Sequence, residues 1–156
     1  MSHSIFGIEK HEIDKLICDK KNTLKWDKYD EHCHRAQIEL PINMINNIYQ
    51  LTGLKYKIDV KQTVCHYVKY DINNLYMIDK HDDHCKITVL IYLFKDNNIA
   101  DKFLIEDTLV NTNKSWNPEK NLYGCVCMWS DDEFGPVHSV EITGKGLREI
   151  LCVFLG

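Results

Sequence analysis

The chain has 156 residues, of which 44% are hydrophobic and 27% charged; these values are ordinary for one globular domain, and the length is too short for two. Its formal net charge is −4 and no basic stripe is visible, which argues against nucleic acid as a partner. Seven cysteines without a disulfide framework, no signal-peptide core and no run of about 20 apolar residues predict an intracellular protein, cytoplasmic or nuclear, without a membrane partner.

The first third of the chain is predicted to be mainly helical. Residues 8–21 place their apolar side chains near one side of a helix. The alternation over residues 36–40 predicts a strand. A second helix is expected over residues 41–52, because a proline opens it and Gly53 supplies its stop. We therefore expect a helical support over about residues 1–53.

The remaining residues, about 55–156, carry strand patterns. Residues 55–70 alternate with period two, and residues 87–94 are apolar on both sides, which is typical of a central buried strand. Further expectations are a turn at 71–74, strands at 75–78, 103–106, 123–129 and 147–154, a loop at 107–121 and a hairpin turn at Gly144-Lys145-Gly146. The pattern predicts an α+β fold, mainly β, in which a barrel or sandwich forms most of a single domain over residues 1–156.

The candidate metal ligands are His81, Asp83 and His138. Two imidazoles and one carboxylate form the ligand set of non-haem Fe(II) oxygenases, because three protein ligands leave three metal positions free. A His-x-Asp pair is expected by chance about once in such a chain, so the argument rests on the later histidine as well. The spacing of two lets His81 and Asp83 converge from one extended segment.

Other residues near these ligands, or rich in donor atoms, are not expected to bind metal. His84 should lie behind the ligands or be exposed, and Asp79 and Asp82 should be solvated turn residues. Residues 32–34, His-Cys-His, point in different directions and have no partner pair at zinc spacing. Cys125 and Cys127 share one strand face and are expected to be core thiols.

Arg148 is the candidate anchor for an anionic co-substrate. Lys and Arg total 19, and only Arg35 and Arg148 are arginines. A guanidinium is a planar fork that can bind a carboxylate through two hydrogen bonds, whereas lysine is a point charge. Arg148 shares a strand face with Ile150 and Cys152, which favours this interpretation over that of a surface arginine.

From about Tyr70 to Phe154 the chain resembles the catalytic domain of the Fe(II)- and 2-oxoglutarate-dependent dioxygenases, especially the intracellular oxygen-sensing prolyl hydroxylases. The matching residues are His81-x-Asp83, Thr88, the run Ile91-Tyr92-Leu93, the run Trp129-Ser130-Asp131 before His138, and Arg148 in a closing strand. The resemblance implies a double-stranded β-helix, that is, a jelly-roll or cupin-like barrel, with the N-terminal helices packed outside.

The resemblance also implies a chemistry. The enzyme would decarboxylate 2-oxoglutarate to succinate and CO₂, consume O₂ and hydroxylate a prolyl residue in a protein or peptide, with ascorbate as a candidate reductant. The implied catalytic residues are the Fe(II) ligands His81, Asp83 and His138 together with Arg148, and the implied co-substrate-binding residues are Arg148, Tyr92, Thr88 and Tyr70.

One departure from the family lies before the strand that follows residues 91–93. The family has Gly-Gly there, whereas this chain has residues 98–102, Asn-Ile-Ala-Asp-Lys. Two alternatives therefore stay open: a catalytically weak or inactive prolyl hydroxylase-like interaction module, and the same chemistry on a non-prolyl substrate. Nucleic-acid demethylation is disfavoured, because that resemblance expects an arginine where Phe154 stands.

Overall fold

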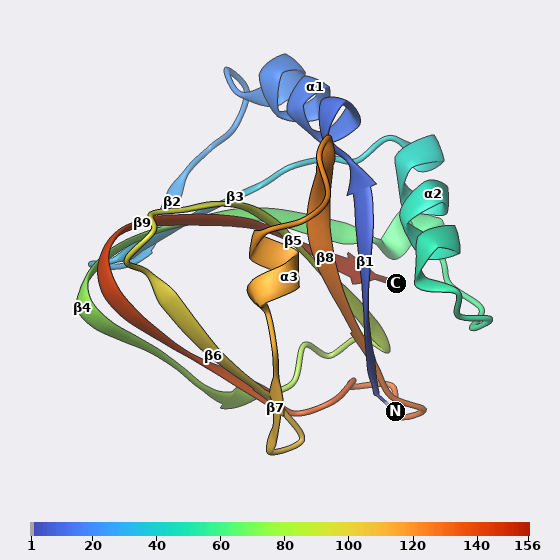
Figure 1. The fold of residues 1–156 in the computed structure, drawn as a ribbon. Helices are drawn as coiled ribbons and strands as arrows, with labels where there is room; N and C mark the ends of the chain where they lie inside the picture. The colour runs from blue at the N-terminus through green and yellow to red at the C-terminus, as the bar shows by residue number, and fades with distance from the viewer. Residues whose placement is uncertain (1) are drawn as a thin grey trace.

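The structure is a computed structural model that describes residues 2–156 (Figure 1). The helices within these residues are α1 (Lys10–Lys20), α2 (Ile42–Thr52) and α3 (Asn113–Trp116), with a 3-10 turn η1 (Val60–Gln62). The strands are β1 (His3–Glu9), β2 (Asp27–Asp30), β3 (Cys33–Gln37), β4 (Val64–His81), β5 (Ile87–Lys95), β6 (Ala100–Ile105), β7 (Thr108–Val110), β8 (Leu122–Trp129) and β9 (His138–Leu155). None of the helices in residues 2–156 is long and apolar enough to cross a membrane.

All nine strands of the described residues belong to one sheet with the order β1-β8-β5-β9-β4-β3-β2, and β6 pairs with β9 and β7. The two longest strands, β4 and β9, are antiparallel and paired from one end to the other. On its second edge, β9 pairs with β6 through its first residues and with β5 through its last ones. The sheet therefore folds into two walls joined by the long curve of β4 and β9 that Figure 1 shows.

The curve lies at Gly144 and Gly146, where a hairpin turn was expected. Both glycines have positive φ, +105° and +136°, and a Cβ atom at Gly144 would lie 2.2 Å from the carbonyl oxygen of Asn98. On the partner strand, Asn74 adopts a φ of 94° opposite Gly144. The predictions of turns at 71–74 and 144–146 are therefore wrong. Both segments lie inside continuous strands, which they bend without ending.

Two apolar clusters occupy the two faces of the central strands. Alternate side chains of β5 point to opposite faces of the sheet, so Val89 and Ile91 face α1 and α2, while Leu90 and Tyr92 face the interior of the barrel. Ile13 of α1 is among the residues that cover the outer face. The central buried strand and the helices packed outside are thus confirmed.

The N-terminal segment differs from its expected form. Helix α2 ends as predicted, with Gly53 in the left-handed conformation at φ 71°. However, β1, β2 and β3 also lie within residues 1–53 and add strands to the sheet. Residues 8 and 9, which were expected to begin the first helix, are the end of β1 and pair with β8. Further along, residues 55–59 are not strand, and the expected loop at 107–121 contains β7 and α3.

Candidate metal centre and its cavity

His81, Asp83 and His138 converge at one end of the barrel. His81 is the last residue of β4 and His138 the first of β9, and the two are cross-strand partners after a bulge. The Nε2 atom of His81 lies 3.4 Å from Oδ1 of Asp83, and Nε2 of His138 lies 3.3 Å from Oδ2. One donor atom from each residue lies within 4.8 Å of the others, and within residues 2–156 no other group of three His, Cys, Asp or Glu side chains is so close.

The two imidazole rings are held so that Nε2 faces the carboxylate. Nδ1 of His81 lies 2.8 Å from the carbonyl oxygen of Asp79, and Nδ1 of His138 lies 2.9 Å from that of Pro136. A carbonyl oxygen accepts a hydrogen bond from Nδ1–H, so a ring that carries no proton on Nε2 would present the Nε2 lone pair to a metal. Ligands about 2.1 Å from a metal at right angles lie about 3 Å apart, so the spacing fits a divalent ion of the iron type.

Asp83 is the anionic member of the group. Burial raises the pKa of its carboxyl, but hydrogen bonds from His138, His81 and Thr88 outweigh this and hold the pKa well below its usual range. The Thr88 hydroxyl donates to Oδ2 at 2.8 Å. In turn, the hydrogen bond to Asp83 raises the pKa of His81 against the effect of burial. Two imidazoles and a carboxylate held in this way could bind iron.

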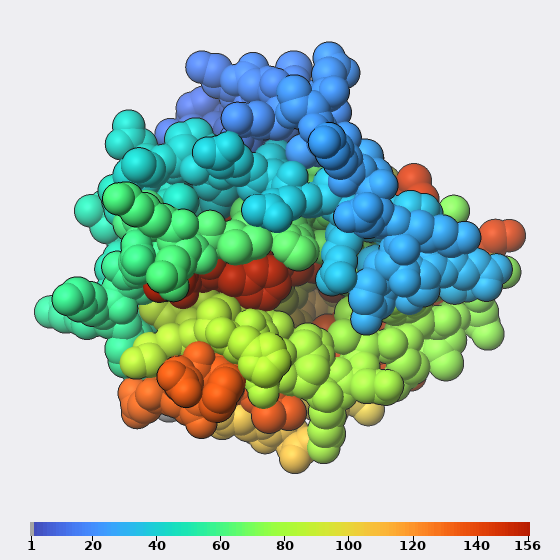
Figure 2. Space-filling view, turned by 180° about the vertical axis from the view of Figure 1, so that it is seen from behind, coloured from blue at the N-terminus to red at the C-terminus, as the bar shows by residue number. Residues whose placement is uncertain are grey.

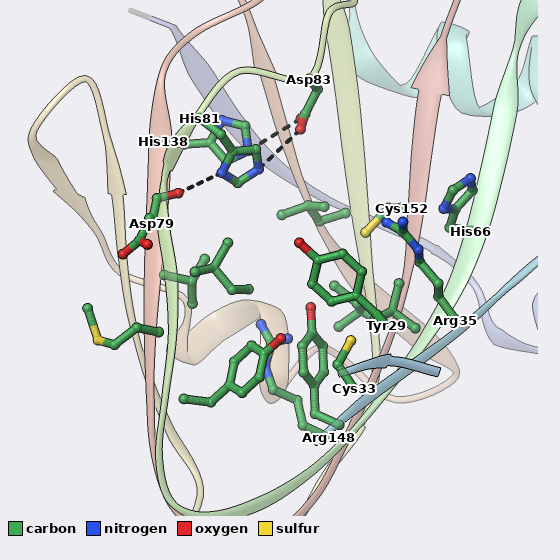
Figure 3. A pocket seen from close by; sticks show the side chains of 18 of the residues that line it. Tyr29, Cys33, Arg35, His66, Asp79, His81, Asp83, His138, Arg148 and Cys152 are labelled. Atoms are coloured by element: carbon green, nitrogen blue, oxygen red, sulfur yellow. Dashed lines mark hydrogen bonds and ion pairs between the residues drawn. The ribbon is translucent and has the colours of Figure 1, made fainter. Parts of the chain in front are cut away.

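The three residues line a cavity of about 560 Å³ that extends into the barrel (Figure 3). Cross-strand pairing gives its length. Thr88, which contacts Asp83, pairs with Phe154 of β9. Cys152, Ile150 and Arg148 follow along β9 at intervals of two residues, and each of them with its cross-strand partners forms one row of the sheet. Each step is about 7 Å. Arg148 therefore lies three rows from the metal end, at the far end of the cavity in Figure 3.

Arg148 is buried and paired with Asp101 of β6. Its Nε lies 3.0 and 3.2 Å from the two carboxylate oxygens, and its Nη2 lies 3.0 Å from Oδ2. Trp116 donates its indole N–H to the same carboxylate at 2.9 Å. Burial lowers the pKa of Arg148, but Asp101 more than compensates, so the pKa is raised. One edge of the guanidinium fork is thus occupied by the protein itself, and Nη1 is buried without a partner.

The other residues of the resemblance lie at different depths. Tyr92 is 2% exposed, and its buried hydroxyl has no hydrogen-bond partner. The centre of its ring lies 6.0 Å from Cζ of Arg148. Tyr70 lines the cavity, with its ring 4.9 Å from the same Cζ. The Thr88 hydroxyl donates a hydrogen bond to Asp83, so it orients a candidate metal ligand.

The residues that were not expected to bind metal lie outside the group. The His84 side chain is 79% exposed beside Asp82, and Cys125 and Cys127 are fully buried in the core as expected. Among residues 32–34, Cys33 is buried and His34 exposed, so they do not converge.

Two residues near the site were missed from the sequence: Asp101, which is buried against Arg148, and Arg35, which lines the cavity. Asp101 has the same strand parity as the buried Phe103 and Ile105, and this parity was the available signal, but the strand was expected to begin only at Phe103. Arg35 lines the cavity from β3, and that strand was expected to begin only at Ala36.

Comparison with known proteins concerns the fold. A crystal structure of a Pseudomonas putida prolyl-4-hydroxylase matches 99% of this chain and 92% of its own, with a TM-score of 0.60 and 13% identity. The structure of IDO from Bacillus thuringiensis matches 97% of this chain and 93% of its own, with a TM-score of 0.57 and 12% identity. The chain has a jelly-roll fold. No protein-family model and no curated protein matches its sequence.

Within this jelly roll, the metal candidates come from three places. His81 ends a long strand, Asp83 follows it in the connection to β5, and His138 begins the last strand. All three lie at the end of the barrel away from the bend at Gly144. The fold therefore brings together residues that are far apart in sequence at one mouth of one cavity.

Proposed function

We propose that this protein is an Fe(II)- and 2-oxoglutarate-dependent dioxygenase that hydroxylates a prolyl residue in a protein or peptide. The observation that carries the proposal is the convergence of His81, Asp83 and His138 at the wall of a cavity of about 560 Å³. The similarity in fold to a protein named prolyl-4-hydroxylase supports the prolyl substrate.

In this proposal the chain holds and orients the metal. His81, Asp83 and His138 would bind Fe(II) and leave three positions for co-substrate and O₂. The bound iron would allow O₂ to act as the oxidant: one oxygen atom would convert a C–H bond of the substrate into C–OH, and the other would enter succinate as 2-oxoglutarate loses CO₂. The carbonyl oxygens behind the two rings keep both Nε2 atoms directed at the metal, and the Thr88 hydroxyl fixes the carboxylate of Asp83.

The proposed anchor for the far carboxylate of 2-oxoglutarate is Arg148 with Tyr92. Nη1 of Arg148 and the hydroxyl of Tyr92 are two buried donors without partners, and a buried donor without a partner costs about 1–3 kcal/mol. A carboxylate oxygen would satisfy them. The Nε and Nη2 edge is taken by Asp101, so a bidentate grip through that edge would require that Asp101 be displaced, whereas a grip that includes Nη1 would not.

The same ion pair favours a second candidate function. Asp101 neutralises the charge of Arg148 in the absence of a ligand. A site that binds an anionic co-substrate does not need such an internal partner for its arginine. The second candidate is therefore an inactive interaction module that keeps the fold to bind a prolyl hydroxylase or its substrate.

Peptide oxidation separates the two functions. Proline-containing peptides are incubated under air with the protein, Fe(II), 2-oxoglutarate and ascorbate, and analysed by mass spectrometry. The enzyme proposal predicts the gain of one oxygen atom on proline, absent without Fe(II) and absent in His138→Ala. A gain on another residue would support the same chemistry on a non-prolyl substrate. No oxidised peptide, together with no succinate formed, would support the interaction module.

A further inference from the structure

Arg35 lies on the cavity wall between the metal candidates and Arg148. It pairs across the sheet with Val68 of β4, which pairs with Ile150 of β9. This row is one step of two residues, about 7 Å, nearer to the metal end than the row of Arg148. Figure 3 shows the Arg35 side chain beside Cys152 and His66, on the opposite side of the cavity from Asp79.

Arg35 is exposed and has no ion-pair partner in the part of the chain that the structure describes. None of the ion pairs within residues 2–156 involves it, although Asp27 is its cross-strand neighbour. The other cationic side chains that line the cavity are paired, Lys80 with Asp107 and Arg148 with Asp101. Burial and then the charge of Arg35 lower the pKa of the neighbouring His66.

The guanidinium lies over the aromatic ring of Tyr29, a residue that is 60% exposed. Its Cζ lies 4.6 Å from the ring centre of Tyr29, which also lines the cavity. Stacking on a ring leaves the N–H groups at the edge of the guanidinium plane free to donate. In Figure 2 the blue segment borders a hollow whose other side is the yellow-green part of the chain, and Arg35 is among the residues that line the cavity.

We propose that Arg35 binds a carboxylate of the substrate, and that the protein therefore selects acidic substrates. This rests on the proposed function only for the statement that the bound molecule is the one oxidised. A carboxylate is favoured over a phosphate group because three acidic side chains, Asp30, Asp79 and Asp83, line the same cavity and would repel a dianion more strongly.

Binding of matched acids and amides to the metal-free protein tests the proposal. The probes are three matched pairs. Two are N-acetyl-L-proline with its amide and N-acetyl-L-leucine with its amide. The third is a peptide with an internal proline, made in one version with glutamate and in another with glutamine beside the proline. Dissociation constants are measured by NMR titration for the wild type, Arg35→Gln, Arg35→Lys and Lys28→Gln. Lys28 is an exposed lysine of β2 outside the cavity lining, so Lys28→Gln removes the same charge as Arg35→Gln elsewhere.

The expected result is a preference for acid over amide of about fivefold in the wild type, as for one arginine-carboxylate pair near the surface. Arg35→Gln should bring the ratio to about one, Arg35→Lys should keep part of it, and Lys28→Gln should leave it unchanged. If only the free N-acetyl amino acids show the preference, the carboxylate is the substrate's terminal one. If only the peptide shows it, the carboxylate belongs to a glutamate side chain.

Three results would overturn the proposal. They are a wild type that binds neither member of any pair or does not distinguish them, a preference that survives Arg35→Gln, and inorganic phosphate binding more tightly than every acid. Because the protein carries no metal in this experiment, a failure to oxidise any substrate would leave the result on Arg35 unaffected.

Discussion

Arg148 of β9 and Asp101 of β6 form a bidentate ion pair in which the two side chains are 2% and 0% exposed. Asp101 pairs with Ile142 in the first part of β9, and Arg148 lies in the second part beyond the bend, so the ion pair joins the two walls of the barrel. Breaking such a pair leaves a buried charge without compensation, which costs more than an exposed pair contributes.

The first prediction concerns stability. Asp101→Ala should lower the free energy of unfolding by about 3–5 kcal/mol, because Arg148 remains buried without its partner. Lys80→Ala removes one side of an exposed pair and should cost less than about 1 kcal/mol. Both are measured by urea denaturation. The double replacement Asp101→Leu with Arg148→Met should be more stable than Asp101→Ala, and a less stable double variant would contradict the argument.

The second prediction concerns 2-oxoglutarate. If the co-substrate carboxylate binds Arg148, Asp101 competes with it, so Asp101→Asn should lower the dissociation constant by about tenfold, the effect of one charge-assisted hydrogen bond. Arg148→Ala should raise it by on the order of 30-fold or more. The measurement is an anaerobic titration of the Fe(II)-loaded protein, with Asp107→Asn as control. A change of less than threefold in both Asp101→Asn and Arg148→Ala would falsify the assignment of Arg148.

The third prediction concerns Thr88. Its hydroxyl donates to the oxygen of Asp83 that faces His138, so Thr88→Val removes a contact that orients the carboxylate. Partners of this kind typically change metal affinity by about 10- to 100-fold. The variant should bind Mn(II) more weakly by this factor in a calorimetric titration, while Thr108→Val, at an exposed position of β7, should bind normally. Equal affinity in both variants would mean that the contact has no role in metal binding.

The fourth prediction concerns pH. Burial and Arg35 lower the pKa of His66 in the folded protein, so between the folded and unfolded values, the latter about 6.5, the unfolded chain binds more protons. The stability from this group is complete above the unfolded pKa and is lost as the pH falls towards the folded one. His66→Gln should therefore reduce the loss of stability from pH 7 to pH 5 in urea denaturation, and His11→Gln, at a side chain 79% exposed, should not. An unchanged slope in His66→Gln would contradict the shift.

The sequence predicted the parts of the fold in which local and tertiary preferences agree. β5 is apolar on both faces and is central, and α2 has its proline and glycine at the two ends. The bend of β4 and β9 was not predictable in this way, because Asn74 and Gly144 are turn residues locally while the barrel makes them bend a paired strand. The pairing of β4 with β9 in the folded sheet determines that these residues bend a strand and do not end it.

The candidate site shows the same division. The order of His81, Asp83 and His138 was enough to suggest a ligand group, because their types and spacing carry the chemistry. Asp101 could be found only from its parity with Phe103, and the sequence does not indicate that it pairs with Arg148 from another strand. The unpaired state of Arg35 likewise depends on which carboxylates the fold leaves out of its reach.

The most direct test of the central claim is succinate formed from 2-oxoglutarate under air in the presence of Fe(II). Two replacements are compared in folded protein: Asp83→Ala, which removes the anionic ligand, and Asp82→Asn, which changes the neighbouring carboxylate that accepts from the backbone of His84. We predict that the wild type and Asp82→Asn form succinate, that Asp83→Ala does not, and that formation stops under argon. No succinate from the wild type, or equal amounts from Asp83→Ala, would contradict the proposed function.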